Sequence, residues 1–260
     1  MGNPEPRDLK DQVAIVTGAS RGIGKGLALG LARAGAAVVC AARTVQESPD
    51  GLPGTIHATV AEIEGEGGSA LAVRCDIGVS SDVDAMVEAA LDRFGRIDIL
   101  VNNAMAPTRG LFDETSLDMW DESMTTNVRS LFTTTKAVVP PMTAGGGGSI
   151  INVSSGAADH AVGASLPAGF AVYSVAKAAL ERFSTAMAVE LTPKGIAVNA
   201  LRPGAVKTEM ATRELGEEFD WTGWTTPEAV VPAVVWLAAQ RGDGFTGRVI
   251  DSTTFGSAWP

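Results

Sequence analysis

Residues that build metal centres or disulfide frameworks are scarce in this sequence. Its 260 residues include two cysteines, Cys40 and Cys75, and two histidines, His57 and His160. The cysteines lie at the ends of apolar, strand-like runs, so we expect buried thiols, and two are too few for a disulfide framework. The histidines lie far apart and no Cys-x-x-Cys pair occurs. We therefore predict no metal site.

The sequence also has few basic residues and no long apolar stretch. The chain has 20 basic and 30 acidic residues, which gives a formal net charge of -10 at pH 7. This charge repels a phosphate backbone and no basic run offsets it, so we expect no nucleic-acid partner. The longest clean apolar stretch, residues 229–239, is too short to span a bilayer, and residues 1–10 lack an apolar signal core. We expect a cytoplasmic protein with no membrane partner.

Aromatic side chains make up only 5% of the chain, whereas hydrophobic residues make up 45% and glycines number 30. This balance favours tight turns and closely packed layers over an aromatic-rich sandwich. The length suits one large α/β domain, and no internal repeat or low-complexity linker divides it. We predict a single domain over residues 1–260, with residues 1–9 as a flexible N-terminal arm.

Short β-branched runs alternate with helical segments along the chain. Val13–Thr17 is a continuous apolar run of strand length, and residues 22–34 then repeat apolar side chains at helical spacing up to Gly35. Further strands are expected at 38–42, 70–74, 97–101, 149–153, 196–201 and 248–251, and further helices at 56–66, 80–94, 116–139, 172–191 and 227–239. We expect the helix over 116–139 to end at Pro140 and Pro141.

This alternation predicts an α/β fold of the Rossmann type, a doubly wound, mostly parallel sheet with helices on both faces. Right-handed crossovers connect parallel neighbours, and the helices supply them. Ligands in such sheets bind beyond the carboxyl ends of the strands. The loops that follow residues 17, 42, 74, 101, 153 and 201 should therefore line one site.

The first of these loops, TGASRGIG at residues 17–24, is rich in glycine. Such a turn between strand and helix lets the backbone approach a pyrophosphate, which the free N–H groups and dipole of the helix N-terminus then bind. Gly18 suits the tight turn, Gly22 the close approach and Gly24 the packing of helix on strand. Because the spacing is G-x-x-x-G-x-G rather than G-x-G-x-x-G, a glycine-rich loop without a ligand stays an alternative.

Tyr173 is the only tyrosine in the chain, and Lys177 follows it by four residues on a predicted helix. This spacing places both side chains on one helix face. A nearby ammonium favours the phenolate, so we expect Lys177 to lower the pKa of Tyr173. A tyrosine of lowered pKa can exchange a proton at neutral pH, as interconversion of an alcohol and a carbonyl requires. By itself this four-residue spacing arises easily by chance.

Six segments together resemble the short-chain dehydrogenases/reductases, in the order found in that family and over about residues 10–251. They are TGASRGIG, NNAM at 102–105, Asn127, Ser154–Ser155, Tyr173 with Lys177, and RPGAVKT at 202–208. The resemblance implies a catalytic tetrad of Asn127, Ser155, Tyr173 and Lys177.

The resemblance also implies a role for each member of the tetrad. Ser155 would hydrogen-bond the substrate oxygen, with the adjacent Ser154 as the competing candidate. Tyr173 would transfer the proton, and Lys177 would hold the nicotinamide ribose. Asn127 would bind a water that links Lys177 to solvent.

The same likeness implies a dinucleotide site. Asp76 would hydrogen-bond the adenine, Asn103 and Ala104 would support the adenine-side strand, and residues 203–208 would cover the nicotinamide. The cofactor-binding residues expected are Gly18, Ser20, Arg21, Gly22, Ile23, Gly24, Arg43, Asp76, Ile77, Asn103, Ala104, Tyr173, Lys177, Pro203, Gly204, Val206 and Thr208.

The end of the second strand predicts which dinucleotide binds. An NAD site needs a carboxylate there for the ribose 2′-hydroxyl, and Ala42 stands at that position. Arg43 follows at once and Arg21 projects from the glycine loop, so two guanidinium groups converging on a 2′-phosphate would favour NADP(H). The alternative is that both arginines only face solvent.

Three features depart from the family pattern. Met105 replaces a usual glycine, Ser155 and Tyr173 lie further apart than usual because of extra residues within 157–170, and the usual glycine pair after Asp251 is missing. In addition, the long loop at 45–55 is similar to an insertion in the hydroxysteroid dehydrogenase-like branch. None of these departures removes a catalytic group.

The sequence is thus identified with an NADP(H)-dependent oxidoreductase that interconverts a carbonyl and an alcohol, with a ketone, 3-oxoacyl or hydroxysteroid-like substrate. An apolar substrate is expected because residues 208–226 would form a lid rich in apolar side chains. The alternatives are a non-catalytic nucleotide-binding redox sensor or scaffold on the same fold, and a sugar-nucleotide epimerase or dehydratase. We expect a homotetramer or homodimer formed through the helices at 116–139 and 172–191.

Overall fold

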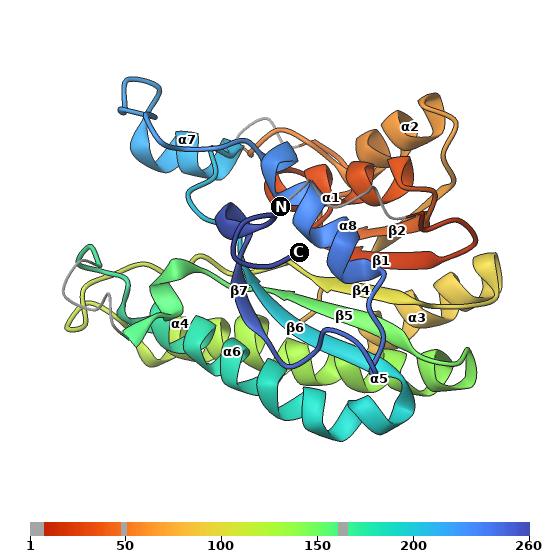
Figure 1. The fold of residues 1–260 in the computed structure, drawn as a ribbon. Coiled ribbons are helices and arrows are strands. Elements are labelled where there is room, and N and C mark those ends of the chain that lie inside the picture. The colour runs from red at the N-terminus through yellow and green to blue at the C-terminus, as the bar shows by residue number, and fades with distance from the viewer. Residues whose placement is uncertain (1–7, 48–50, 161–165) are drawn as a thin grey trace.

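Seven parallel strands form one sheet in the computed structural model, which describes residues 8–47, 51–160 and 166–260 (Figure 1). The strand order is β3-β2-β1-β4-β5-β6-β7. The chain adds strands toward one edge of the sheet up to β3 and toward the other edge from β4 onward, so the order switches between β1 and β4. The strands are β1 Val13–Thr17, β2 Ala37–Ala42, β3 Ala70–Arg74, β4 Ile99–Asn102, β5 Gly148–Val153, β6 Ile196–Arg202 and β7 Val249–Asp251. The predicted doubly wound α/β fold and single domain are confirmed, and ligands are expected beyond the carboxyl ends of these strands.

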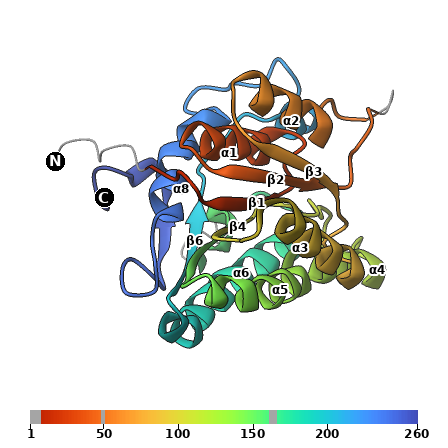
Figure 2. The same ribbon diagram turned by 90° about the vertical axis from the view of Figure 1, so that its right-hand side faces the viewer.

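Helices cover both faces of the sheet, with α1 and α2 on one side and α3, α5 and α6 on the other (Figure 2). Successive residues of β1 enter different cores. Ala14 and Val16 pack in the cluster with α1 and α8, while Ile15 packs in the cluster with α3, α5 and α6. Burial on both faces explains why the strand reads as a continuous apolar run. The helices are α1 Gly22–Arg33, α2 Ile56–Gly65, α3 Ser80–Phe94, α4 Leu117–Met124, α5 Ser130–Ala144, α6 Ala171–Leu191, α7 Glu209–Leu215 and α8 Val231–Ala238.

The long helix expected at 116–139 is not one regular helix. A π-helical segment, Thr125–Arg129, separates α4 from α5, and α5 continues through Pro140 and Pro141 to Ala144. The prediction that the prolines end the helix was therefore wrong. Their fixed φ suits a helix, and each removes only one backbone donor. Val138 and Met142, which are fully buried on either side of the prolines, hold the last turns against the sheet.

The N-terminal arm expected at residues 1–9 falls mostly outside the described residues, which begin at Asp8. Leu9 is fully buried, and its N–H donates to the Ala34 carbonyl at 2.8 Å. For Leu9 the prediction of a flexible arm was wrong, because an apolar side chain in the core beside α1 is anchored by burial.

A buried polar network joins the sheet to the two helices below it. The Asn102 amide donates to the Asn152 side-chain oxygen at 2.9 Å and accepts from Thr134 at 2.9 Å. Asn152 in turn donates to the Ser184 hydroxyl at 2.8 Å. Because all four side chains are buried, these bonds fix α5 and α6 relative to β4 and β5.

Candidate active site

The glycine loop has the backbone geometry that its sequence predicts. Gly18 and Gly22 have φ of +69° and +54°, in the left-handed region that favours glycine. A Cβ at Gly24 would lie 2.2 Å from the Gly18 carbonyl oxygen, so no larger residue fits between helix and strand. Helix α1 has no side-chain N-cap bond and no acidic residue in its first turn. Its first N–H groups are therefore suited to an anion such as a pyrophosphate.

The NNA segment after β4 supports this loop. The Thr17 hydroxyl accepts hydrogen bonds from the N–H groups of Asn103 and Ala104 at 3.0 and 3.1 Å. The Asn103 amide donates to the Thr17 carbonyl at 2.9 Å. A Cβ at Gly18 would lie 2.8 Å from the same amide nitrogen. The structure thus brings Asn103 and Ala104 against the glycine loop, while their support of the adenine-side strand stays a prediction.

The two arginines expected at a 2′-phosphate are placed differently from one another. Arg21 donates to the carbonyls of Pro53 and Gly54 at 2.9 and 2.8 Å, so its guanidinium is held by the loop before α2. Arg43 is 67% exposed at the end of β2, with its guanidinium 3.8 Å from the Asp76 carboxylate. Two of the five N–H donors of Arg21 are thus bound to loop carbonyls, and the convergence of both guanidinium groups on one phosphate stays a prediction.

Asp76 and Ile77 lie just beyond β3, at the same edge of the sheet. One Asp76 oxygen accepts from the Gly78 N–H at 3.0 Å, which holds the carboxylate close to its own loop. Ile77 is buried and packs with β2 and α3. This edge therefore presents one carboxylate beside one exposed guanidinium, that of Arg43.

Tyr173 and Lys177 lie one turn apart on α6, and the Lys177 Nζ is 5.7 Å from the Tyr173 ring centroid. Lys177 is buried, and its Nζ donates to the Val153 carbonyl at 2.7 Å. Burial lowers the pKa of Lys177 to about 8, although the nearby Glu181 acts in the opposite direction. The Lys177 ammonium therefore bonds to the end of β5 and also lies beside the phenol ring of Tyr173.

The pKa of Tyr173 is raised in this structure, mainly by burial, while the side chain of Ser155 and the charge of Arg109 act to lower it. The prediction that Lys177 lowers this pKa was therefore wrong. Desolvation disfavours the phenolate, and the Lys177 ammonium is bound to a carbonyl instead of the phenol oxygen.

The structure distinguishes the two adjacent serines. Ser155 lies near enough to the Tyr173 phenol to lower its pKa, whereas Ser154 is buried and donates to a Glu181 carboxylate oxygen at 2.7 Å. Arg202 binds the same carboxylate through two nitrogens at 2.8 and 2.9 Å. Ser154 thus belongs to a supporting network, and Ser155 is the serine at the candidate acid/base.

Asn127 lies in the π-helical segment and is buried. Its amide donates to the Ala106 carbonyl at 3.0 Å and to the Ser123 hydroxyl at 3.1 Å, and its oxygen accepts from the Ala106 N–H at 2.9 Å. One side-chain N–H therefore holds the loop after β4, and the other bonds to Ser123 on α4. A water at Asn127 would have to be bound through an acceptor oxygen.

The segment after β6 reaches back to the glycine loop. A Cβ at Gly22 would lie 3.3 Å from the Thr208 methyl group, and the Thr208 hydroxyl caps α7. Val206 pairs with Thr225 in an isolated bridge, and Pro203 is buried while Gly204 is exposed. The structure thus places the start of α7 over the proposed pyrophosphate cradle.

A family model described as short chain dehydrogenase matches residues 12–218. The chain belongs to this family. It is 40% identical over 249 residues to a 3-oxoacyl-(acyl-carrier-protein) reductase of Synechocystis sp., covering 94% of this chain and 96% of the relative. It is 35% identical over 247 residues to hydroxysteroid dehydrogenase-like protein 2 of Xenopus tropicalis, covering 95% of this chain and 58% of that protein. The crystal structure of a dehydrogenase/reductase from Sinorhizobium meliloti 1021 is similar with a TM-score of 0.79 at 31% identity, over 94% of each chain.

Several residues of this short-chain dehydrogenase site were not predicted from sequence. Phe170 packs edge-on to Tyr173 at 6.1 Å between ring centroids, and the Met105 sulfur lies 3.9 Å from the phenol oxygen. Arg109 and Glu214 both act electrostatically on Tyr173. These four residues come from loops and helices that lie far apart in the sequence, so sequence spacing does not bring them together. The one signal available was the sequence departure at Met105, since it marked this loop as unusual.

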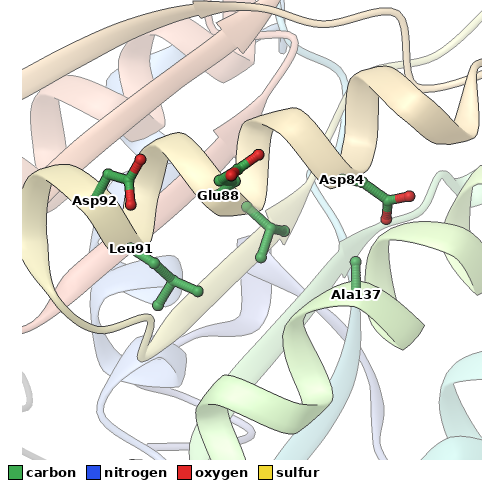
Figure 3. Close-up of a pocket in the computed structure, with 6 residues that line it drawn as sticks. Asp84, Glu88, Leu91, Asp92 and Ala137 are labelled. Atoms are coloured by element: carbon green, nitrogen blue, oxygen red, sulfur yellow. The ribbon is translucent and has the colours of Figure 1, made fainter.

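Two cavities lie outside the tetrad. One of about 890 Å³ opens between the glycine loop, the turn at 52–53 and α7, and Gly22 and Thr208 line it. The other, about 280 Å³, is a shallow groove between α3 and α5 lined by Asp84, Glu88 and Asp92 (Figure 3). Only the first lies at the dinucleotide edge of the sheet.

Among the residues that the structure describes, no helix is long and apolar enough to cross a membrane. Over the same residues, no group of three His, Cys, Asp or Glu side chains is placed to hold a metal ion. Cys40 and Cys75 are buried, as predicted, and burial raises the pKa of each thiol to about 12.

Proposed function

We propose that this short-chain dehydrogenase is an NADP(H)-dependent enzyme that interconverts a carbonyl and an alcohol, with Tyr173 as acid/base. The observation that carries the proposal is that Lys177 lies one turn from Tyr173 on α6, with its Nζ 5.7 Å from the tyrosine ring centroid, while Ser155 lies near enough to act on the pKa of the phenol. Family membership makes the protein an oxidoreductase of a nicotinamide-dependent family. A non-catalytic sensor would not need to keep these three side chains together.

The dinucleotide, when bound, would supply or accept the hydride. Gly18, Gly22 and the start of α1 would hold its pyrophosphate, and Lys177 its ribose. Ser155 would orient the substrate carbonyl by a hydrogen bond to its oxygen. Because the pKa of Tyr173 is raised, its phenol is protonated at neutral pH and suited to donate a proton to that oxygen.

Preference for NADP(H) is supported chiefly by Arg43, since two of the five N–H donors of Arg21 are bound to loop carbonyls. No carboxylate stands at Ala42 to hold a ribose 2′-hydroxyl, and the Arg43 guanidinium is exposed. A charge-assisted hydrogen bond contributes roughly 1.5–3 kcal/mol, which corresponds to about tenfold or more in affinity. Arg43→Asp should therefore reverse much of the preference. Fluorescence titration with NADPH and NADH tests this, and equal or tighter binding of NADH by the wild type contradicts it.

An apolar substrate with a ketone, 3-oxoacyl thioester or hydroxysteroid-like carbonyl fits the lid, where Met210, Leu215 and Phe219 follow the segment that reaches the glycine loop. One of the relatives named above, the reductase of Synechocystis sp., is named for a 3-oxoacyl substrate. The decisive experiment incubates purified protein and NADPH with a panel of ketones and 3-oxoacyl thioesters and follows absorbance of the cofactor. Absence of oxidation across the whole panel contradicts the proposed reaction.

A further inference from the structure

Arg109, on the loop after β4, lies at the rim of the proposed reaction centre. Its guanidinium carbon is 3.6 Å from the ring centroid of Phe170 and 5.7 Å from that of Tyr173. The neighbouring Gly110 N–H donates to the Gly169 carbonyl at 3.1 Å, which ties this loop to the segment before α6. Stacking and backbone bonding thus hold a permanent positive charge beside the tyrosine.

The ion pair that Arg109 forms with Glu214 is exposed, and another anion could replace the glutamate. Arg109 lies 3.3 Å from a Glu214 oxygen of α7, and the two side chains are 38% and 36% exposed. Among the residues that the structure describes, no hydrogen bond of Arg109 accompanies this ion pair. A guanidinium has five N–H donors in a planar fork, and an exposed ion pair contributes little stability. Most of the binding capacity of Arg109 is therefore available at the rim.

We infer that Arg109 binds a carboxylate of the substrate, in the position that Glu214 takes here, so that the natural substrate is an apolar oxo acid or hydroxy acid. This inference rests on the proposed function and narrows its substrate class. A carboxylate matches the guanidinium fork through two parallel hydrogen bonds. Phe170 and the lid supply apolar surface for the rest of such a molecule. Glu214 would leave Arg109 when the acid binds, which couples substrate binding to α7.

The test compares a medium-chain oxo acid with its methyl ester, which lacks the negative charge and adds only one methyl group. Arg109→Gln should raise KM for the acid by about tenfold or more and leave the ester almost unchanged, because only the acid loses a charge-assisted contact. Arg93→Gln is the matched control, since Arg93 also stacks on an aromatic ring, Phe94 at 5.0 Å, but on the outer helix α3. Glu214→Gln should keep or lower KM for the acid. Equal effects of Arg109→Gln on both substrates would show that Arg109 only packs or latches the lid, and overturn the inference.

A binding measurement separates this inference from the proposed reaction. Octanoate should raise the thermal midpoint of the wild type and of Arg93→Gln but not of Arg109→Gln, and octanamide should raise none of them. If no ketone is reduced but octanoate shows this pattern, the reaction is wrong and the anion site stands. If ketones are reduced and octanoate does not depend on Arg109, the reaction stands and the anion site is wrong.

Discussion

At the scale of single residues, the phenol of Tyr173 is the group on which the proposed chemistry depends. Tyr173→Phe should lower kcat by at least about 100-fold, the scale of lost general acid catalysis. The affinity for NADPH should stay close to that of the wild type, because the ring and its packing against Phe170 remain. Near-normal turnover of a verified substrate by the Phe variant would assign the proton transfer to another group.

The buried ammonium of Lys177 leads to a second prediction, on how the free energy of unfolding depends on pH. Its pKa in the fold, about 8, lies below the ordinary value of 10.5, so between these values the unfolded chain binds more protons. Stability contributed by this group therefore rises with pH from about 8 to 10.5, by roughly 3 kcal/mol in total. Lys177→Met removes the buried charge.

The comparison is made by thermal unfolding of the two proteins. The thermal midpoint of Lys177→Met relative to wild type should be highest near pH 7 and fall as the pH approaches 9.5. A difference that does not change over this pH range would mean that Lys177 keeps its ordinary pKa in the folded protein.

At the scale of elements, the junction of β1 and α1 depends on the absence of a side chain at Gly24. A Cβ there would lie 2.2 Å from the Gly18 carbonyl oxygen, so Gly24→Ala must separate helix from strand. We expect at least about tenfold weaker NADPH binding and a loss of about 1–3 kcal/mol in unfolding free energy, the range for overpacking. Gly65→Ala is the control, since a Cβ at Gly65 meets nothing within 4 Å at the end of α2. Fluorescence titration and urea unfolding measure the two effects, and equal behaviour of both variants contradicts the packing argument.

The interruption between α4 and α5 shows why element boundaries were harder to predict than element types. Asn127 is a poor helix former, and it falls inside the helix expected at 116–139. Its hydrogen bonds to Ala106 and Ser123 explain its presence, but the π-helical turn that aims it depends on a loop 21 residues earlier in the chain. Pro140 and Pro141 led to the prediction of a helix end where the helix continues. The packing of neighbouring side chains against the sheet outweighs the two backbone N–H donors that the prolines lack.

At the scale of the whole molecule, α5 and α6 leave apolar side chains exposed on their outer faces. Phe132 on α5 is 55% exposed and Val189 on α6 is 77% exposed, so each offers apolar surface for contact with another subunit. We predict that these helices associate in a homotetramer, or a homodimer, in solution. Light scattering at micromolar concentration should show the oligomer, and Phe132→Glu with Val189→Glu should shift it to smaller species. His57→Glu on α2 is the control, and a wild-type monomer contradicts the prediction.

Local patterns in the sequence determined the order of strands and helices, the edge of the sheet that carries the site, and the pairing of Tyr173 with Lys177. These follow from periodicities of a few residues and from glycine positions, which short stretches of chain specify by themselves. Only the tertiary structure decided that Ser155 rather than Ser154 meets the phenol, that loop carbonyls bind Arg21, and that Arg109 meets Glu214 beside the active site. Those outcomes depend on desolvation and on which side chains from distant segments come within a few ångströms of one another, and neither is encoded in sequence spacing.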